Sequence, residues 1–284
     1  MTKLIVQAAE VATPNLKRLA QLSGASAIEA ILQPDASRQA FRLVDADPSS
    51  QAEVAAFCDE TQYDHAFVQA GKQLKDFGLV VMDMDSTLIT IECIDEIADM
   101  QGIKDKVAAI TERSMRGEID FSQSLRERVS LLAGLDESAL QRVYDERLAL
   151  SPGAERMLRT AHQAGLKSLL VSGGFTFFTE RLKARLGLTH AHANTLEVVD
   201  GKLTGQLVGD ILDAQAKVDW LARVRDDLGL QPEQVIALGD GANDLKMLAA
   251  AGVGIAYHAK PIVRQQAAYA LTHVGLDGWL NWFA

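Results

Sequence analysis

The sequence has few cysteines, no basic run and no long apolar run. Cys58 and Cys93 are its only cysteines, and neither belongs to a Cys-x-x-Cys or Cys/His cluster, which excludes a disulfide framework and makes a structural zinc site improbable. The net charge of −10 argues against nucleic acid and anionic membranes as partners. No apolar stretch reaches the length of a membrane span, and residues 1–6 predict a short strand rather than a signal peptide. We therefore expect a cytoplasmic globular protein.

The first 72 residues predict a small separate domain. Their pattern indicates strands at 4–8, 27–32, 40–44 and 65–68, and helices at 15–22 and 51–61. The order strand–helix–strand–strand–helix–strand is typical of a ferredoxin-like α+β fold. The segment contains no dense polar cluster, so a packing or dimerising role is expected. Gly71 and Gly78 bracket a polar junction, across which we expect few contacts.

Residues 73–284 predict an α/β domain with a helical insertion. The apolar run 79–82 is typical of a buried parallel strand. Residues 92–150 are rich in helix formers and carry apolar residues at helical spacing, so we expect a helical cap inserted directly after that strand. Insertions at this position commonly act as lids. Strands at 167–171 and 235–238, with a hairpin turning at Asp200-Gly201, complete the pattern of a doubly wound sheet.

Polar residues follow three of these predicted strands. The carboxyl ends of parallel strands lie along one edge of a sheet, where ligands bind. Carboxylate and amide oxygens there suit Mg²⁺, and a serine followed by glycines can hold an anion at a helix N-terminus. The residues concerned are Asp83 and Asp85, Ser172 with Gly173, and Asp240 with Asn243 and Asp244.

Each of these signals also has a purely structural interpretation. Strand-end aspartates often form turns, and Ser, Asn and Asp often cap helices. Lys217, early in a predicted helix, would by itself indicate only a solvated helix face. The glycines around Asp240 do not complete a dinucleotide-binding motif, because Asp244 takes the place of its last glycine, and no P-loop occurs.

In order and spacing, four elements resemble the haloacid dehalogenase superfamily of phosphotransferases. They are Asp83-Met84-Asp85-Ser86-Thr87, Ser172, Lys217, and Gly239-Asp240 with Asp244. Within that superfamily, the extended stretches 83–98 and 121–132 are similar to the phosphoserine phosphatases. Bacterial relatives carry ACT-type regulatory domains at the N-terminus, and the pattern of residues 1–72 is compatible with one.

The resemblance implies a magnesium-dependent reaction. Mg²⁺ would lie between Asp83, the backbone carbonyl of Asp85, and Asp240, with Asn243 and Asp244 in support. Asp83 would attack phosphorus, and Asp85 would act as the acid and then the base. Lys217, Ser172 and the Gly173 amide would bind the phosphoryl oxygens.

The resemblance also implies how the cap selects the substrate. Glu92 would meet the ammonium of phosphoserine, and Arg128 would bind its carboxylate, for which a planar bidentate donor is suited. Arg126 is the plausible confusion, since it lies two positions away on the helix. Met115 and Phe121 would form an apolar wall. Without the resemblance, Arg128 would be a surface arginine and the apolar pair ordinary cap packing.

These implications favour hydrolysis of O-phosphoserine, a small molecule, as the last step of serine biosynthesis. Two alternatives stay open at this point. One is a phosphatase of the same superfamily acting on another small phosphomonoester, such as phosphothreonine, or transferring phosphate to homoserine. The other is a non-catalytic amino-acid sensor. A homodimer formed through the N-terminal domain is also left open.

Overall fold

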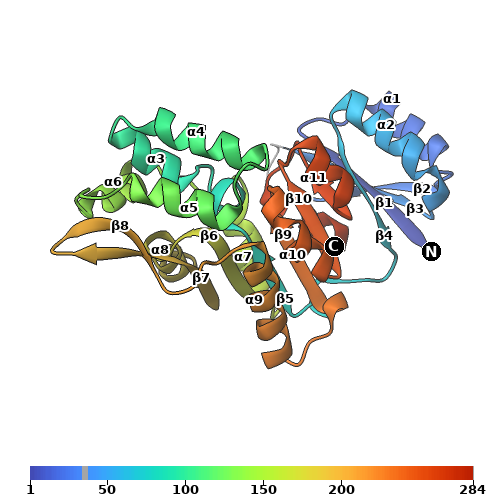
Figure 1. The fold of residues 1–284 in the computed structure, drawn as a ribbon. Coiled ribbons are helices and arrows are strands. Elements are labelled where there is room, and N and C mark those ends of the chain that lie inside the picture. The colour runs from blue at the N-terminus through green and yellow to red at the C-terminus, as the bar shows by residue number, and fades with distance from the viewer. Residues whose placement is uncertain (34–37, 284) are drawn as a thin grey trace.

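The computed structural model describes residues 1–33 and 38–283 and arranges them around two β-sheets (Figure 1). The first sheet has four antiparallel strands in the order β2-β3-β1-β4. Its elements are β1 (Thr2–Ala8), α1 (Thr13–Leu22), β2 (Ala27–Ile31), β3 (Gln39–Val44), α2 (Gln51–Thr61) and β4 (Asp64–Gln69). Both the succession of elements and this strand order are those of a ferredoxin-like α+β fold, as predicted.

The second sheet has seven strands in the order β11-β10-β9-β5-β6-β7-β8. Neighbouring strands are parallel except for β7 and β8, which form an antiparallel hairpin. The strands are β5 (Leu79–Met82), β6 (Lys167–Phe175), β7 (His190–Val199), β8 (Lys202–Val208), β9 (Val235–Gly239), β10 (Val253–Tyr257) and β11 (Tyr269–Leu271). The helices that follow the cap are α7 (Ala154–Gln163), α8 (Thr176–Leu186), α9 (Ala214–Asp227), α10 (Leu245–Ala250) and α11 (Pro261–Gln266).

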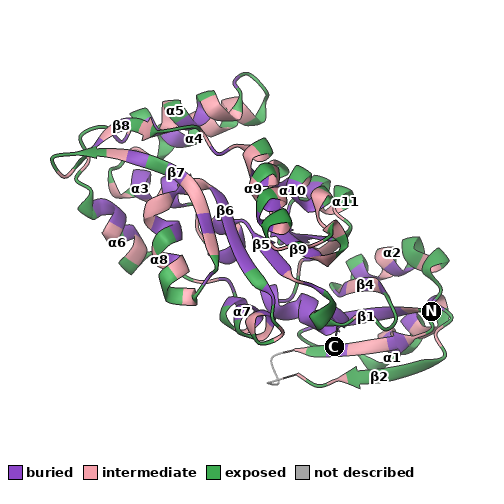
Figure 2. Ribbon diagram, turned by 90° about the horizontal axis from the view of Figure 1, so that it is seen from below, coloured by how far each residue is buried: buried purple, intermediate pink, exposed green. Residues whose placement is uncertain are grey.

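Both faces of this sheet are covered, which explains why its central strand β5 is apolar at every position. Leu79 and Val81 of β5 pack with α9 and α10, whereas Val80 and Met82 pack on the opposite face with α7 and α8. This alternation follows from the two-residue period of a strand. Figure 2 shows β5, β6 and β9 as largely buried strands between the helical layers. The predicted doubly wound α/β core is thereby confirmed.

The predicted helical cap is also present, directly after β5. It consists of α3 (Cys93–Met100), α4 (Lys104–Met115), α5 (Phe121–Ser130) and α6 (Ser138–Glu146). An isolated bridge between Ile89 and Leu150 closes its base. The far end of the cap is tied to the β7–β8 hairpin, because the Gly134 amide donates to the Leu203 carbonyl over 2.8 Å. The cap therefore lies against the carboxyl ends of the core strands (Figure 1).

The turn between β7 and β8 has the predicted geometry. Asp200 and Gly201 both have positive φ, 50° and 74°, as a two-residue type I′ turn requires.

The expectation of few contacts between residues 1–72 and the remainder is wrong. The buried carboxylate of Asp64, at the start of β4, accepts hydrogen bonds from the amides of Thr272, His273 and Val274 at 2.7, 2.9 and 2.9 Å. A 3-10 segment at the end of the chain, Leu276–Phe283, packs Trp279 into the same core as residues of β1 and β4. These contacts could not be predicted from the sequence, because they join residues about two hundred positions apart.

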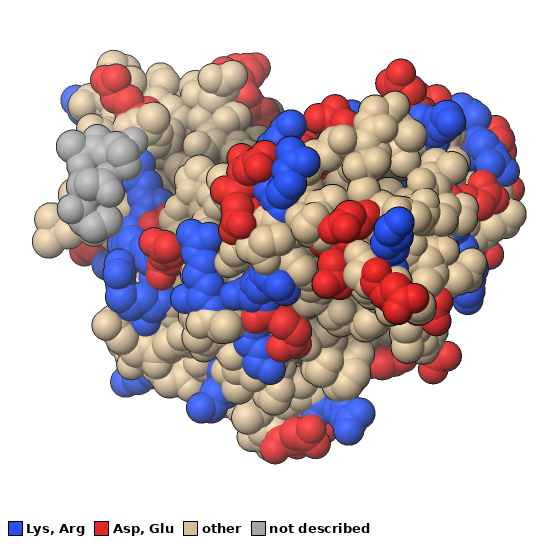
Figure 3. Space-filling view, turned by 90° about the vertical axis from the view of Figure 1, so that its left-hand side faces the viewer, with Lys and Arg blue, Asp and Glu red and all other residues tan. Residues whose placement is uncertain are grey.

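The surface of the protein carries charges of both signs. On the face shown in Figure 3, acidic and basic side chains both occur, and basic ones gather on its left flank. Among the described residues, no helix is both long enough and apolar enough to cross a bilayer.

Candidate active site

Three adjacent strands bring the predicted site residues together. Asp83 follows β5, Asp240 follows β9, and Ser172 lies near the end of β6, on the other side of β5. Their side chains surround a cavity of about 110 Å³ between the sheet edge and the cap. The lining residues are Asp83, Asp85, Glu92, Ile94, Phe121, Leu125, Arg128, Ser172, Gly173, Gly174, Phe175, Asp240 and Asn243.

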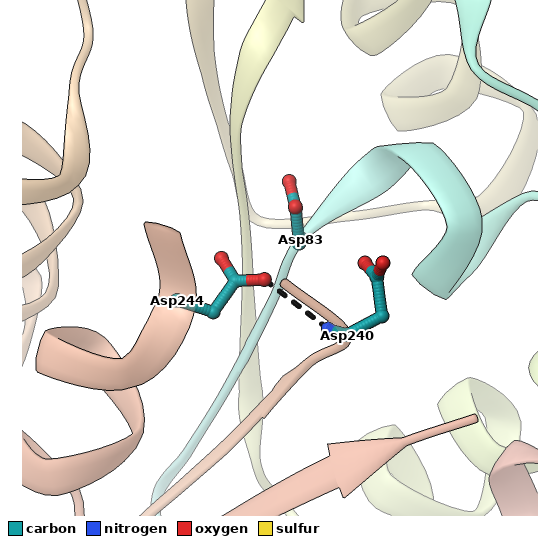
Figure 4. A group of neighbouring side chains, drawn as sticks. All are labelled: Asp83, Asp240 and Asp244. Carbon is teal, nitrogen blue, oxygen red and sulfur yellow. Dashed lines mark hydrogen bonds between the residues drawn. The ribbon is translucent and has the colours of Figure 1, made fainter. Parts of the chain in front are cut away.

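Three carboxylates form an acidic cluster at the base of this cavity. Carboxylate oxygens of Asp83, Asp240 and Asp244 all lie within 4.8 Å of one another, and all three side chains project on the same side of the strand ends (Figure 4). Burial, followed by the charge of Asp244, raises the pKa of Asp240 to about 7 and raises that of Asp83 as well. Crowded, buried oxygen donors of this kind suit a hard divalent cation such as Mg²⁺.

Asp244 connects the acidic cluster to Lys217 and to the backbone that follows β9. Its Oδ1 accepts a hydrogen bond from Lys217 Nζ at 2.6 Å, and its Oδ2 accepts from the amides of Asp240 and Gly241, each at 3.1 Å. Both of its oxygens are therefore engaged by donors of the protein itself. The supporting role expected for Asp244 stays a prediction.

Lys217 is a buried ammonium between two carboxylates, not a solvated lysine. Its Nζ lies 2.9 Å from Asp83 Oδ2 and 2.6 Å from Asp244 Oδ1. Burial by itself would lower the pKa of Lys217, but the two carboxylates outweigh burial and raise it. The lysine is thus held in its charged form beside Asp83.

Asp85 points away from the acidic cluster toward the cap and toward residues 172–174, an irregular stretch near the end of β6 that we call the β6 loop. Its Oδ1 accepts from the amide of Cys93, the first residue of α3, at 2.9 Å. A Cβ added to Gly174 would lie 2.6 Å from Asp85 Oδ2, so the close approach of this carboxyl requires glycine there. Burial raises the pKa of Asp85, which favours a carboxyl group that can carry a proton.

Ser172 is held in a loop that enters the cavity. Its side chain is buried, and Oγ accepts from the Gly174 amide at 2.9 Å. A Cβ on Gly173 would lie 2.9 Å from the ring of Phe121. The cap therefore reaches the loop directly, and only glycine leaves room for that contact.

The cap contributes a carboxyl group, from Glu92, and a guanidinium group, from Arg128, to the same cavity. Glu92 Oε1 accepts from the Ser86 hydroxyl at 2.6 Å. Although Glu92 as a residue is exposed, its carboxyl lies in the recessed cavity, where burial and the charge of Asp85 raise its pKa to about 7. Arg128 is half-buried and lines the cavity, whereas Arg126 is exposed on the outer side of α5. The structure thus brings Glu92, Phe121 and Arg128 together as expected.

Met115 is the exception. It is 69% exposed and is absent from the cavity lining. The inner face of α4 has the buried Val107 and the half-buried Ile110 and Ser114 at helical spacing, which leaves Met115 off that face. In this conformation the apolar wall consists of Phe121 with Ile94 and Leu125.

The sequence interpretation assigned no role to Thr87, although this residue completes the Asp83–Thr87 motif. Its buried hydroxyl donates to Asp240 Oδ1 at 2.9 Å and so connects the ends of β5 and β9. The Cys93 amide was missed too, and no side-chain pattern could have revealed it, because the contact is made by the backbone.

A larger cavity of about 450 Å³ lies elsewhere, between α2 and β4 on one side and α11 and β11 on the other. None of the acidic-cluster residues lines it. Size alone therefore does not identify the site; the convergent carboxylates and Lys217 do.

Comparison with known proteins agrees with this geometry. Residues 80–249 match the model of the haloacid dehalogenase-like hydrolases. A phosphoserine phosphatase from a Polaromonas species is 54% identical over 214 residues, which cover 74% of this chain and 91% of that protein. The chain belongs to the haloacid dehalogenase-like hydrolases and, within them, to the phosphoserine phosphatase family.

Solved structures extend the likeness to the N-terminal sheet. A haloacid dehalogenase family hydrolase from Salmonella enterica has a TM-score of 0.90 at 31% identity, covering 99% of this chain and 98% of that one. A probable phosphoserine phosphatase from Vibrio cholerae has a TM-score of 0.84 at 39% identity, covering 99% of this chain and 86% of that one. In the chain described here, residues 4–54 match a domain of unknown function, DUF4072.

Proposed function

We propose that the protein hydrolyses O-phospho-L-serine to L-serine and inorganic phosphate in a magnesium-dependent reaction, in the cytoplasm, as the last step of serine biosynthesis. The supporting observation is that one small cavity contains both a phosphate-directed cluster and a pair of opposite charges from the cap. Glu92 suits the ammonium of phosphoserine, and Arg128 suits its carboxylate. The name of the Polaromonas relative points to the same substrate.

Charge must be neutralised before an anionic nucleophile can approach a phosphate ester. A magnesium ion held by Asp83, the Asp85 backbone carbonyl and Asp240 would supply positive charge to the phosphoryl oxygens. Lys217 contributes a second positive charge from the same side, since its ammonium contacts Asp83. Ser172 and the Gly173 amide bind a phosphoryl oxygen from the β6 loop, with Asn243 at the cavity edge.

Asp83 and Asp85 then have separate roles, the first as nucleophile and the second as acid and base. The Asp83 carboxylate attacks phosphorus, the bond from phosphorus to the seryl oxygen breaks, and Asp85 gives its proton to that oxygen. Asp85, now ionised, takes a proton from a water molecule that attacks the aspartyl-phosphate. Phosphate leaves and Asp83 is restored. The raised pKa of Asp85 supports its role as the first proton donor.

We further propose that residues 1–72 form an ACT-like regulatory or dimerising domain. Strand β2 supports this, because it lies at the edge of its sheet, and its residues are exposed except the half-buried Ile31. An exposed edge strand offers backbone groups to a second copy. Analytical ultracentrifugation tests the homodimer: a monomer across the working concentration range would contradict it.

A substrate panel tests the proposed activity. Phosphate release is measured from phosphoserine, phosphothreonine and sugar phosphates, with magnesium and with EDTA. We expect phosphoserine to be used best and EDTA to abolish turnover. A preference for another ester, or phosphate transfer to homoserine, would indicate a different substrate for the same site, and no turnover at all would support the amino-acid sensor instead.

A further inference from the structure

Asn194 is a buried polar side chain that the proposed chemistry does not use. It lies in β7 and is only 2% exposed. Its Nδ2 donates to the Gly173 carbonyl at 2.8 Å, and its Oδ1 accepts from the Leu212 amide at 2.7 Å. Both halves of the amide are therefore used, each by the backbone of a different loop.

The first of these bonds reaches the loop that carries Ser172. Between the register pairs Val171–His192 and Phe175–Asn194, β6 advances four residues (175 − 171) and β7 only two (194 − 192). The extra residues of β6 bulge into the cavity. The Gly173 carbonyl and the Gly174 N–H belong to one planar peptide group, and that N–H donates to Ser172 Oγ. Asn194 thus orients the peptide group that holds the Ser172 hydroxyl.

The second bond reaches the helix that carries Lys217. Leu212 precedes Asp213, whose carboxylate caps α9 by accepting from the amides of Gln215 and Ala216, each at 2.9 Å. Lys217 follows in the first turn of α9 and extends to Asp83. The two loops also touch, since a Cβ on Gly173 would lie 3.8 Å from the Leu212 carbonyl oxygen. Asn194 Oδ1 thus fixes the point at which α9 begins.

We propose that Asn194 is a positioning residue that sets the spacing between the Ser172–Gly173 anion-binding groups and the Lys217 ammonium. The two sets of donors can contact the same phosphoryl group only if their loops keep a fixed separation. Asparagine is suited to this because it has a donor and an acceptor on one planar group. Aspartate lacks the donor, and leucine, of similar size, lacks both. The inference rests on the proposed phosphatase function.

The test compares Asn194→Leu and Asn194→Asp with the wild-type enzyme. We expect kcat/KM for phosphoserine to fall about 100-fold in Asn194→Leu, because both anion-binding groups are displaced. Inhibition by orthovanadate, a phosphate-like oxyanion, should weaken in parallel. Stabilisation by Mg²⁺ in thermal melting should be unchanged, because the hydrogen bonds of Asn194 go to the Gly173 carbonyl and the Leu212 amide and not to Asp83 or Asp240. Asn194→Asp keeps the Leu212 bond and provides the decisive measurement if the leucine variant does not fold.

Ser168→Ala provides a matched control. Ser168 is fully buried near the opposite end of β6, where Oγ accepts from the Thr189 amide at 3.1 Å and contacts His162 Nε2 at 2.9 Å. Its loss should lower the melting temperature and leave kcat/KM and vanadate inhibition unchanged. Wild-type kinetics in a folded Asn194 variant, or equal losses in Ser168→Ala, would overturn the proposal. Absence of phosphoserine turnover in the wild type would overturn the function instead, while vanadate binding, followed by thermal shift, would still report on Asn194.

Discussion

The ammonium of Lys217 lies 2.9 Å from a carboxylate oxygen of Asp83, and both side chains are almost completely buried. This lysine lowers the pKa of Asp83, but burial and the charge of Asp244 act in the opposite direction and prevail. Lys217 alone therefore does not keep Asp83 ionised. A divalent cation beside Asp83 and Asp240 would add the missing positive charge, which explains why a nucleophilic carboxylate can be placed in so buried a position.

Replacement of Asp83 by asparagine should abolish phosphate release. An amide of the same shape cannot form the acyl phosphate that the two-step route requires. Phosphate release and trapping of the phosphorylated protein measure the effect. Asp76→Asn, an exposed aspartate just before β5, is the control and should behave as wild type. Turnover of Asp83→Asn within about tenfold of wild type would exclude Asp83 as the nucleophile.

Asp85→Asn should affect leaving-group protonation more than nucleophilic attack. We expect a large loss with phosphoserine, on the order of 10²–10⁴-fold, and a smaller loss with p-nitrophenyl phosphate, whose leaving group needs no proton. The Asn side chain can still accept from the Cys93 amide, so the local structure should persist. Equal losses on both esters would assign Asp85 to another role.

Arg128→Ala should change substrate selection. Loss of a desolvated partner for a carboxylate costs on the order of 2–5 kcal/mol, so use of phosphoserine should fall far more than use of phosphoethanolamine, which has an ammonium but no carboxylate. Arg126→Ala, on the exposed side of the same helix, is the matched control. If Arg128→Ala reduced turnover of both esters equally, Arg128 would serve cap folding or closure instead.

Metal binding should depend on pH with a defined sign. In the metal-free protein the pKa of Asp240 is raised to about 7, so the folded chain binds a proton there that the unfolded chain has lost. The free energy of unfolding should therefore fall as pH rises from the ordinary carboxyl range to about 7. Mg²⁺ removes that loss by stabilising the ionised form.

Thermal melting in EDTA and in excess Mg²⁺ measures this effect. The difference in melting temperature should be small at about pH 5 and larger at about pH 8. Asp240→Asn removes the titrating group and should reduce the difference at both values. Equal stabilisation of the wild type at both pH values would contradict the assignment.

The ends of the apolar strands could be predicted from the sequence because their signals are local. The run 79–82 is buried on both faces, and the polar residues that follow must lie at the sheet edge, so Asp83, Ser172 and Asp240 were correctly expected to converge. Asn194 could not be recognised in this way. Its two partners are backbone groups brought to it by a strand bulge and by tertiary packing.

The position of Met115 shows a different limit of prediction from the sequence. The resemblance places an apolar residue there in a closed site, whereas the helical period of α4 turns it to solvent here. A role for Met115 in the closed site stays a prediction. The contact between the N-terminal sheet and residues 272–283, which we call the N-terminal seam, was missed for yet another reason. Nothing in the sequence around an isolated aspartate such as Asp64 shows that its partners are three amides near the other end of the chain.

That seam changes what is expected when residues 1–72 are removed. All the acidic-cluster residues lie after residue 78, so residues 73–284 should keep the chemical groups. Removal would nevertheless expose Trp279 and deprive Asn281 of Gln7, whose Oε1 accepts from Asn281 Nδ2 at 2.7 Å. We therefore expect the truncated chain to be much less stable, and to hydrolyse phosphoserine only where it stays folded.

Asp64→Ala tests the seam in the full chain. The change leaves three amides without their acceptor, at about 1–3 kcal/mol for each group that stays unpaired, so the melting temperature should fall. Phosphoserine kcat/KM at temperatures where the variant is folded should match wild type, because no residue of the seam lines the active-site cavity. Asp59→Ala, an exposed aspartate at the end of α2 near the same seam, is the control and should change neither quantity. A folded Asp64→Ala protein with reduced kcat would instead show that the N-terminal sheet helps to shape the active site, and the proposal of two domains divided near residue 72 would fail.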